Sequence, residues 1–218
     1  MTIKTSGTLS MQEINAEFGL GTNLYAYRGV KWYRDDNSRG YFDQAMGNNP
    51  PIDMLEFYGK RKTIPVVASG PTAQANGSYF SVPFYNKITI TITGGSGGQA
   101  GAYGINACDR NNPTPSGGGG VGGTSSFGGY GSAVGGGGGS GNAGGGSVGQ
   151  TTIIVFDAEA DPNAPLKGIP ILNTIGAGGA GGRGGPNGVY LGPTCYFPYT
   201  EAATGATGSP GSITIKVE

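Results

Sequence analysis

Residues 87 to 104 read KITITITGGSGGQAGAYG, a strand pattern that runs directly into glycine repeats. In the first part, Ile88, Ile90 and Ile92 alternate with threonines, which is the two-residue period of a β-strand with a buried face. In the second part, glycine recurs every third residue from Gly95 onward. Three residues is the repeat of an extended polyproline II-type helix. The stretch therefore predicts a small sheet whose strands continue into extended glycine segments.

The same combination recurs further along the chain. Short strand patterns stand at residues 152 to 156 and 212 to 217, and the three-residue glycine spacing returns at 135 to 144 and 176 to 188. Glycine makes up 47 of the 218 residues, whereas ordinary domains contain about 7%. Helices of this kind have no internal hydrogen bonds, and glycine lets their backbones touch. We therefore expect a bundle of packed polyglycine II helices whose ends are tied to short β-strands.

Two other structures share this composition. Glycine and proline content alone favours a disordered linker, but linkers seldom carry a regular period or many aromatic residues. A collagen-like triple helix needs a long run of triplets, and Gly205, Gly208 and Gly211 supply only a short one. The packed bundle is the prediction that fits both the period and the aromatic content.

The first 64 residues have an ordinary composition and predict a small α+β unit. Ser10 with Glu13, and Asp53 with Glu56, have the spacing of a capping box or its acidic variant at the start of a short helix. A unit of this size buries little apolar surface and is marginally stable alone. We therefore expect it to associate with other chains.

Strand character in this unit falls at residues 25 to 33 and 40 to 42, on either side of a polar turn. The aromatic residues available for a core are Trp32, Tyr33, Tyr41 and Phe42. We expect Lys60 to Lys62 to be exposed at the start of a linker that covers 65 to 76, with a basic docking patch as the alternative. The predicted fold is mostly β and irregular: a small α+β module over 1 to 64, the linker, and a glycine-rich domain over 77 to 218.

The glycine-rich half resembles a known family. GSYFSVPFYNKITITITGG at 77 to 95 is similar to the start of the glycine-rich domain of phage tail fibres and related surface proteins, and GGTSSFGGYG at 122 to 131 and PGSITIKV at 210 to 217 fit the same pattern. The resemblance covers about 77 to 218. The glycine-rich half is similar to the adhesins at the fibre tips of T-even-like phages. That resemblance implies stacked polyglycine II helices, with loops between them that touch the bacterial receptor.

The N-terminal segment carries a second resemblance. SMQEINAEFG at 10 to 19, LYAYRG at 24 to 29 and PIDMLEFYGKR at 51 to 61 resemble a module at the start of phage tail fibre, tail-tip and baseplate-associated proteins. Asp53 stands where that module has a second serine, and the capping chemistry is retained. The resemblance implies attachment to a virion through other phage tail or baseplate proteins. We expect a homo-oligomer, with a trimer favoured.

Charge and apolar content exclude several classes of partner. Thirteen Lys and Arg balance 13 Asp and Glu, so no electrostatic field draws the chain to nucleic acid or an anionic membrane. No stretch approaches the roughly 20 apolar residues of a membrane span, and the N-terminus lacks a signal-peptide core. We expect synthesis and assembly in the host cytoplasm. Cys108 and Cys195 could pair, but cytosolic synthesis favours free thiols.

Catalysis has little support in the sequence. The chain has no histidine, which removes the usual general base and the commonest metal ligand. Matches to G-x-G-x-x-G are expected by chance at this glycine density and lack the context of a dinucleotide site. Asp157, Glu159 and Asp161 offer a calcium site as an alternative to a solvated acidic loop. We expect no enzyme activity, no cofactor and no metal.

The sequence thus predicts a phage tail-associated adhesin that binds a host cell-surface protein or glycan through loops, without catalysis. Aromatic faces stack on sugars and apolar surface, and exposed amides bond hydroxyls. The candidate receptor-binding residues are Asp109, Arg110, Asn111, Asn112, Phe127, Tyr130, Tyr190, Tyr196 and Tyr199. For each aromatic residue, packing at the edge of the bundle is the alternative. Two other identities stay open: a structural baseplate or tail-tip component, and a non-viral glycine-rich matrix protein.

Overall fold

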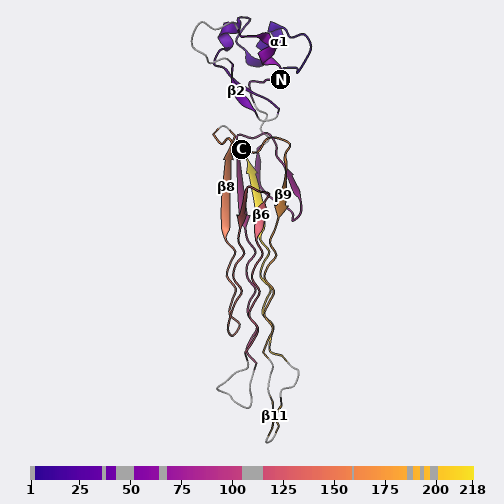
Figure 1. Ribbon diagram of the computed structural model, residues 1–218, viewed down its shortest axis with the longest axis vertical. Coiled ribbons are helices and arrows are strands. Elements are labelled where there is room, and N and C mark those ends of the chain that lie inside the picture. Colours follow the sequence, from indigo (N-terminus) through magenta and orange to yellow (C-terminus); the bar gives the residue numbers. More distant parts are fainter. Residues whose placement is uncertain are drawn as a thin grey trace.

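The computed structural model describes residues 3–35, 38–42, 52–63, 68–104, 115–158, 160–185, 189–191, 194–196 and 201–218. In these residues the protein is mostly β, with antiparallel sheets and one α-helix, which confirms the predicted class. Three parts follow one another along the long axis: an N-terminal unit, a β-sandwich and a glycine bundle (Figure 1).

The N-terminal unit begins with α1 (Met11–Phe18), and its ends are capped as the sequence predicts. The Ser10 hydroxyl accepts from the Glu13 backbone N–H at 3.3 Å, while Glu13 Oε2 accepts from the Ser10 N–H at 2.8 Å. Gly19 ends the helix in the left-handed conformation, with φ 77°, which glycine adopts without strain. The helix turns Ile14 and Phe18 into the core of the unit.

The rest of the unit differs in part from the expectation. Residues 25 to 27, expected within a strand, belong instead to the 3-10 helix η1 (Leu24–Tyr27), because Asn23 Oδ1 accepts from the Tyr25 N–H at 3.0 Å and starts a turn. The strand content is the antiparallel pair β1 (Lys31–Tyr33) and β2 (Arg39–Tyr41). The second capped element is a single 3-10 turn, η2 (Met54–Phe57), where Asp53 Oδ1 accepts from the Leu55 N–H at 2.9 Å.

Aromatic rings fill the core of this unit. Phe42 and Phe57 lie 4.2 Å apart between ring centroids, and Phe18 packs edge-on to Phe42 at 5.2 Å. Tyr27 is fully buried beside Phe57. Of the four aromatic residues expected here, Phe42 is buried and Trp32 packs against the core, whereas Tyr41 is half exposed.

Two four-stranded antiparallel sheets form the sandwich. The first has the order β3–β12–β5–β8, with β3 (Ser69–Ala73), β5 (Lys87–Thr93), β8 (Thr151–Asp157) and β12 (Ser212–Val217). The second has the order β4–β9–β6–β7, with β4 (Tyr79–Ser81), β6 (Ser125–Phe127), β7 (Gly131–Ala133) and β9 (Pro170–Thr174). Residues 69 to 73, expected in the linker, therefore belong to the first sheet, where β3 pairs with β12.

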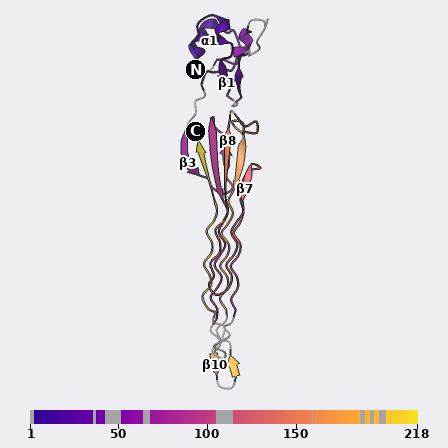
Figure 2. The same cartoon turned by 90° about the vertical axis from the view of Figure 1, so that its left-hand side faces the viewer.

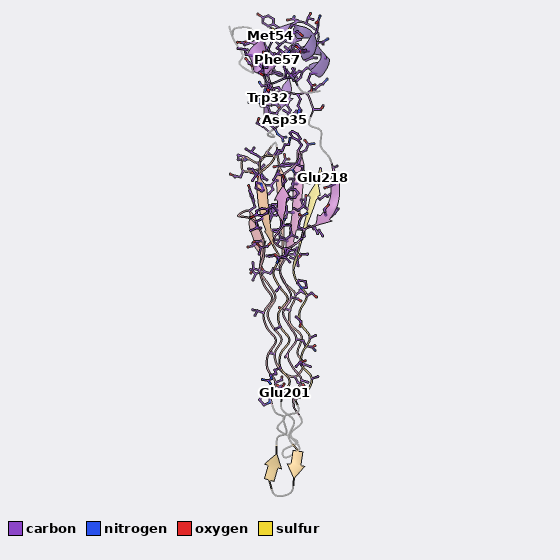
Figure 3. All side chains as sticks on the ribbon, turned by 90° about the vertical axis from the view of Figure 1, so that its right-hand side faces the viewer. Trp32, Asp35, Met54, Phe57, Glu201 and Glu218 are labelled. Carbon is purple, nitrogen blue, oxygen red and sulfur yellow. The ribbon has the colours of Figure 1, made fainter. Side chains whose placement is uncertain are left out.

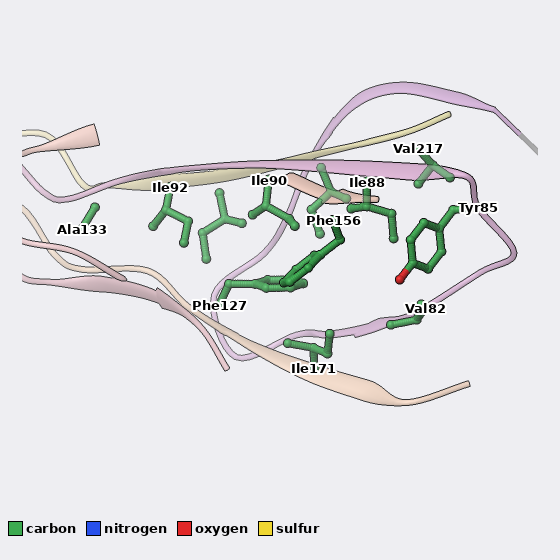
Figure 4. Close-up of a cluster of buried hydrophobic side chains, with 12 residues drawn as sticks. Val82, Tyr85, Ile88, Ile90, Ile92, Phe127, Ala133, Phe156, Ile171 and Val217 are labelled. Atoms are coloured by element: carbon green, nitrogen blue, oxygen red, sulfur yellow. The ribbon is translucent and has the colours of Figure 1, made fainter. Parts of the chain in front are cut away.

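The core between the sheets comes from the alternating strands. Ile88, Ile90 and Ile92 point inward from β5, opposite Phe127 and Ile171 of the second sheet (Figure 4). The isoleucines are at most 1% exposed. Their threonine neighbours face away from the core, as the two-residue period requires. The core ends near Ile92 and Ala133, where side chains give way to glycine (Figure 4).

Six extended segments leave or enter this end of the sandwich and form the glycine bundle (Figure 2). Three segments continue a strand: segment 1 (94–104) follows β5, segment 3 (134–142) follows β7 and segment 5 (175–185) follows β9. Three segments lead into a strand: segment 2 (115–124) precedes β6, segment 4 (143–150) precedes β8 and segment 6 (201–211) precedes β12. Among the described residues, no backbone hydrogen bond joins two residues of the same segment.

Segment 1 lies at the centre of the bundle. Its consecutive N–H groups donate in rotation to segment 4, segment 2 and segment 6, beginning with Gly94 to Gln150, Gly95 to Gly123 and Ser96 to Ser209. The rotation repeats until Ala102, and every donor–acceptor distance lies between 2.8 and 3.1 Å. Segments 3 and 5 in turn donate to carbonyl groups of segment 1. Five segments therefore surround the central one.

Glycine is required where the segments meet. A Cβ on Gly97 would lie 1.9 Å from the Gly137 carbonyl oxygen, and one on Gly98 would lie 2.0 Å from that of Ala180. Side chains hold packed sheets about 10 Å apart, and without them the two layers close until backbone contacts backbone. Residues whose Cβ points outward are free to vary, as Ala177, Ala180 and Arg183 of segment 5 show by their exposure.

Candidate functional site

The two ends of the molecule carry different structures. The N-terminal unit lies beyond one end of the sandwich, and the antiparallel hairpin of β10 (Val189–Leu191) and β11 (Thr194–Tyr196) lies beyond the opposite end of the bundle (Figures 1 and 2). Segments 5 and 6 lead to this hairpin. The candidate binding end is therefore the end furthest from the N-terminal unit.

An ion pair joins the two segments that lead to the hairpin. Arg183 of segment 5 meets Glu201 of segment 6 through two bonds, with Nη2–Oε1 at 2.7 Å and Nε–Oε2 at 3.0 Å (Figure 3 labels Glu201). An exposed pair of this kind adds little to stability. Its two parallel bonds fix the relative position of the segments. No pattern in the sequence indicates this pairing, because the two residues lie 18 positions apart in different segments.

Asn142 closes the shorter hairpin of segments 3 and 4. Its Oδ1 accepts from the Tyr103 N–H at 2.8 Å, and the nearby Ser116 hydroxyl donates to the Gly141 carbonyl oxygen at 3.3 Å. Three segments are thus bonded together at this level of the bundle. These polar side chains also escaped the sequence analysis, because isolated Asn and Ser residues among glycines carry no distinguishing pattern.

Most of the predicted receptor-binding residues cannot be placed as side chains. Asp109, Arg110, Asn111, Asn112 and Tyr199 lie outside the described residues. Tyr190 and Tyr196 lie in β10 and β11, where only the backbone is described; Tyr190 pairs with Cys195 and Tyr196 with Val189. Cys108 also lies outside the described residues.

Phe127 and Tyr130 are the two candidate receptor-binding residues whose side chains the structure places, and the prediction is wrong for Phe127. Phe127 is 1% exposed and belongs to the sandwich core, because the alternation of β6 turns its side chain inward. Tyr130 is 37% exposed, with its ring 5.2 Å from that of Phe156 and 6.2 Å from that of Phe127, so its role in receptor contact stays a prediction. Both residues lie in the sandwich, away from the far end of the bundle.

The flanks of the bundle offer few side chains to a partner. Val121, Val134 and Val148 are exposed there on three different segments, and single exposed apolar residues are ordinary on protein surfaces. The remaining outward positions carry mostly Gly, Ala, Ser and Thr. More side chains are therefore available to recognise a particular partner at the end of the bundle than along its sides.

The basic run Lys60 to Lys62 was expected to be exposed, but only Lys62 is: Lys60 is buried and Arg61 is partly buried. Lys60 is 6% exposed, with Nζ 4.1 Å from the ring centroid of Trp32 and 4.7 Å from that of Phe42. Burial lowers the pKa of Lys60 to about 8, and the nearby Arg34 acts in the same direction. Arg61 lies over the ring of Phe84 in the sandwich at 5.2 Å, so it connects the two units.

The acidic loop forms local turns. Asp157 Oδ1 accepts from the Ala160 N–H at 3.2 Å, and Asp161 Oδ1 accepts from the Asn163 N–H at 2.8 Å. Glu159 lies outside the described residues. Within the described ranges, no group of three or more Asp, Glu, His or Cys side chains is placed to hold a metal ion. No helix in that same part of the chain has the length and apolar character needed to cross a membrane.

Comparisons with known proteins give no match: no family model, no curated protein and no solved structure is significantly similar to this chain.

Proposed function

We propose that the protein is a phage tail-associated adhesin, located in the virion, that attaches by its N-terminal unit and binds a host receptor at the opposite end. The observation that carries this proposal is the separation of the two ends by the bundle (Figure 1). At about 3.1 Å per residue, ten extended residues span about 30 Å. A rigid spacer of this kind suits a protein that must reach from a particle to a cell surface.

We further propose that the glycine segments are polyglycine II helices. Three observations support this. The N–H groups of segment 1 turn to a new neighbour at each residue and return to the first after three. The described residues of a segment make no backbone bonds within it. A Cβ at most inward positions would collide with a neighbouring backbone. A helix with three residues per turn and no internal bonds has these properties.

Binding is proposed to be non-catalytic and to need no cofactor. The aromatic residues Tyr190, Tyr196 and Tyr199 and the polar run Asp109 to Asn112 supply the stacking surfaces and hydrogen-bonding groups that a glycan or protein receptor requires. The bundle flanks, with small side chains at most outward positions, favour recognition at the end of the molecule.

The N-terminal unit is proposed as the attachment site for other tail or baseplate proteins. Among its described residues it exposes Leu20, Tyr25, Tyr41 and Leu55, of which Tyr25 at 61% and Leu55 at 66% are the most exposed. Exposed apolar groups on a small unit with a complete core of its own suit a contact with a partner protein. Leu55→Glu should lower incorporation into particles while the far-ultraviolet circular dichroism spectrum stays unchanged.

An adsorption experiment tests the receptor-binding proposal. Particles carrying Tyr190→Ala, Tyr196→Ala or Tyr199→Ala, or a glycine-serine replacement of 109 to 112, are compared with particles carrying Ala177→Ser on the bundle flank. Losing an aromatic anchor costs about 2 kcal/mol or more, which is roughly thirtyfold in affinity. We expect adsorption or host range to change in the tip variants alone, with assembly intact. Unchanged adsorption after replacement of both candidate loops, 106 to 116 and 189 to 199, would instead favour a structural tail-tip component.

A further inference from the structure

The ring of segments around segment 1 is incomplete. Backbone bonds connect neighbouring segments in the order 4, 3, 2, 5 and 6, and each of these five also bonds segment 1. Among the described residues, no backbone bond joins segment 4 to segment 6, and no segment lies between them. The place between segments 4 and 6, beside segment 1, is called the seam below.

One row of carbonyl groups points into this seam. The segment 1 carbonyls of Gly95 and Gly98 accept from segment 3, and those of Ser96, Gln99 and Ala102 accept from segment 5. The third row consists of the carbonyls of Gly94, Gly97 and Ala100. In the described part of the chain these three have no hydrogen-bond donor. All three residues are buried, and a buried carbonyl without a donor is costly.

The position of the row follows from its neighbours. A Cβ on Gly146 of segment 4 would lie 2.4 Å from the Gly97 carbonyl oxygen, and a Cβ on Gly208 of segment 6 would lie 2.7 Å from it. The oxygen is therefore flanked by both segments.

Two polar side chains of segment 1 close the seam. Gln99 Nε2 donates to the Ala143 carbonyl oxygen of segment 4 at 2.9 Å, and Gln99 Oε1 accepts from the Ala206 N–H of segment 6 at 3.4 Å. The Ser96 hydroxyl accepts from the Ser209 N–H at 2.7 Å. The two side chains thus bond backbone groups of segments 4 and 6 that would otherwise face a sixth neighbouring segment.

We propose that the seam is a binding site for a row of water molecules, one beside each carbonyl of Gly94, Gly97 and Ala100. Water can donate to these unpaired acceptors. A buried water needs two to four polar partners. Beside Gly97 one partner is its own carbonyl, and the polar side chains nearest to it in the chain are those of Ser96 and Gln99, which bond segments 4 and 6 at the seam. The seam is then the hydrated side of an otherwise dry bundle.

A crystal structure of the whole chain at high resolution tests the proposal directly. We expect a water oxygen about 2.8 Å from the Gly97 carbonyl oxygen, and equivalent waters beside Gly94 and Ala100. The proposal is wrong if these carbonyls are dry, or if a segment of a second copy occupies the seam.

Hydrogen exchange of variants provides a second test. Gln99→Leu keeps the size of the side chain but removes the acceptor of the Ala206 N–H, so exchange of that amide should speed up by about tenfold or more. Ser96→Ala should do the same for Ser209 and covers the case in which Gln99→Leu fails to fold. The control is Ala180→Gln, which adds a carboxamide on the outward face of segment 5. Unchanged exchange in both seam variants would show that Ser96 and Gln99 do not hold segment 6 at the seam, which would remove the side-chain partners of the water beside Gly97 and overturn the proposal.

Discussion

The α-carbon of Gly179 lies against the carbonyl of Gly120, so that a Cβ on Gly179 would be 2.0 Å from that oxygen. The next residue, Ala180, is exposed on the flank of the same segment. Gly179→Val should therefore lower the free energy of unfolding by about 3 kcal/mol or more, since the backbone of segment 2 cannot move aside without breaking its own bonds. Ala180→Val is the matched control and should change it by less than about 0.5 kcal/mol. Thermal unfolding followed by circular dichroism measures both, and equal stability of the two variants would contradict the packing.

Ser125 stabilises the border between sandwich and bundle. It is fully buried, its hydroxyl donates to the Thr93 carbonyl oxygen at 2.7 Å, and it accepts from the Gly176 N–H at 3.0 Å. Ser125→Ala removes the hydroxyl partner of the Thr93 carbonyl and the Gly176 N–H. It should lower the free energy of unfolding, measured by chemical denaturation, by about 1 to 3 kcal/mol. Ser126→Ala, on the outer face of the same strand, should cost less than about 0.5 kcal/mol. A similar cost for the two changes would show that the buried hydroxyl is not what matters.

Glu13 makes the N-terminal unit sensitive to acid. The hydrogen bond from Lys4, followed by the Ser10 N–H, lowers the pKa of Glu13 from 4.5 to about 2. A carboxylate with a lowered pKa stabilises the fold fully above pH 4.5, and this contribution is lost as pH falls toward 2. Stability of the wild-type protein should therefore fall between pH 5 and pH 2 relative to Glu13→Gln. Lys4→Met should make that fall smaller, and a fall of the same size in all three proteins would exclude this origin.

Lys60 gives the same unit a dependence on alkaline pH. Its pKa is lowered from 10.5 to about 8 by burial, so between these values the unfolded chain holds a proton that the folded chain has released. The free energy of unfolding should rise with pH across this window. Lys60→Met should lack the rise, which denaturation at pH 7.5 and 10 would detect. Trp32 is the single tryptophan and lies beside Lys60 Nζ, so its fluorescence should titrate near pH 8 in the wild type alone.

Local patterns in the sequence predicted much of the fold. The Ser10–Glu13 spacing predicted the capping box, and the alternation in residues 87 to 93 and 212 to 217 predicted β5 and β12. These features depend on residues close together in the chain. The exceptions were also local: Asn23 turns residues 24 to 27 into a 3-10 helix, and Ser69–Ala73 pairs as an edge strand despite its Gly and Pro.

The candidate site was less predictable, because it depends on which segments become neighbours. Phe127 stands in a glycine-rich stretch that reads as a loop, yet a three-residue strand turns it into the core. Gln99 and Asn142 bond across the bundle to residues 39 or more positions away. No sequence pattern within one segment indicates the order in which the other segments surround segment 1.

The bundle repeats every three residues, and each outgoing segment is paired with a returning one. One extra triplet in each segment would leave every kind of contact unchanged and move the far end outward by about 9 Å. Removal of a triplet from each would draw it back by the same step. The number of triplets thus sets the reach of the molecule in fixed increments, independently of the N-terminal unit at one end and the hairpin at the other.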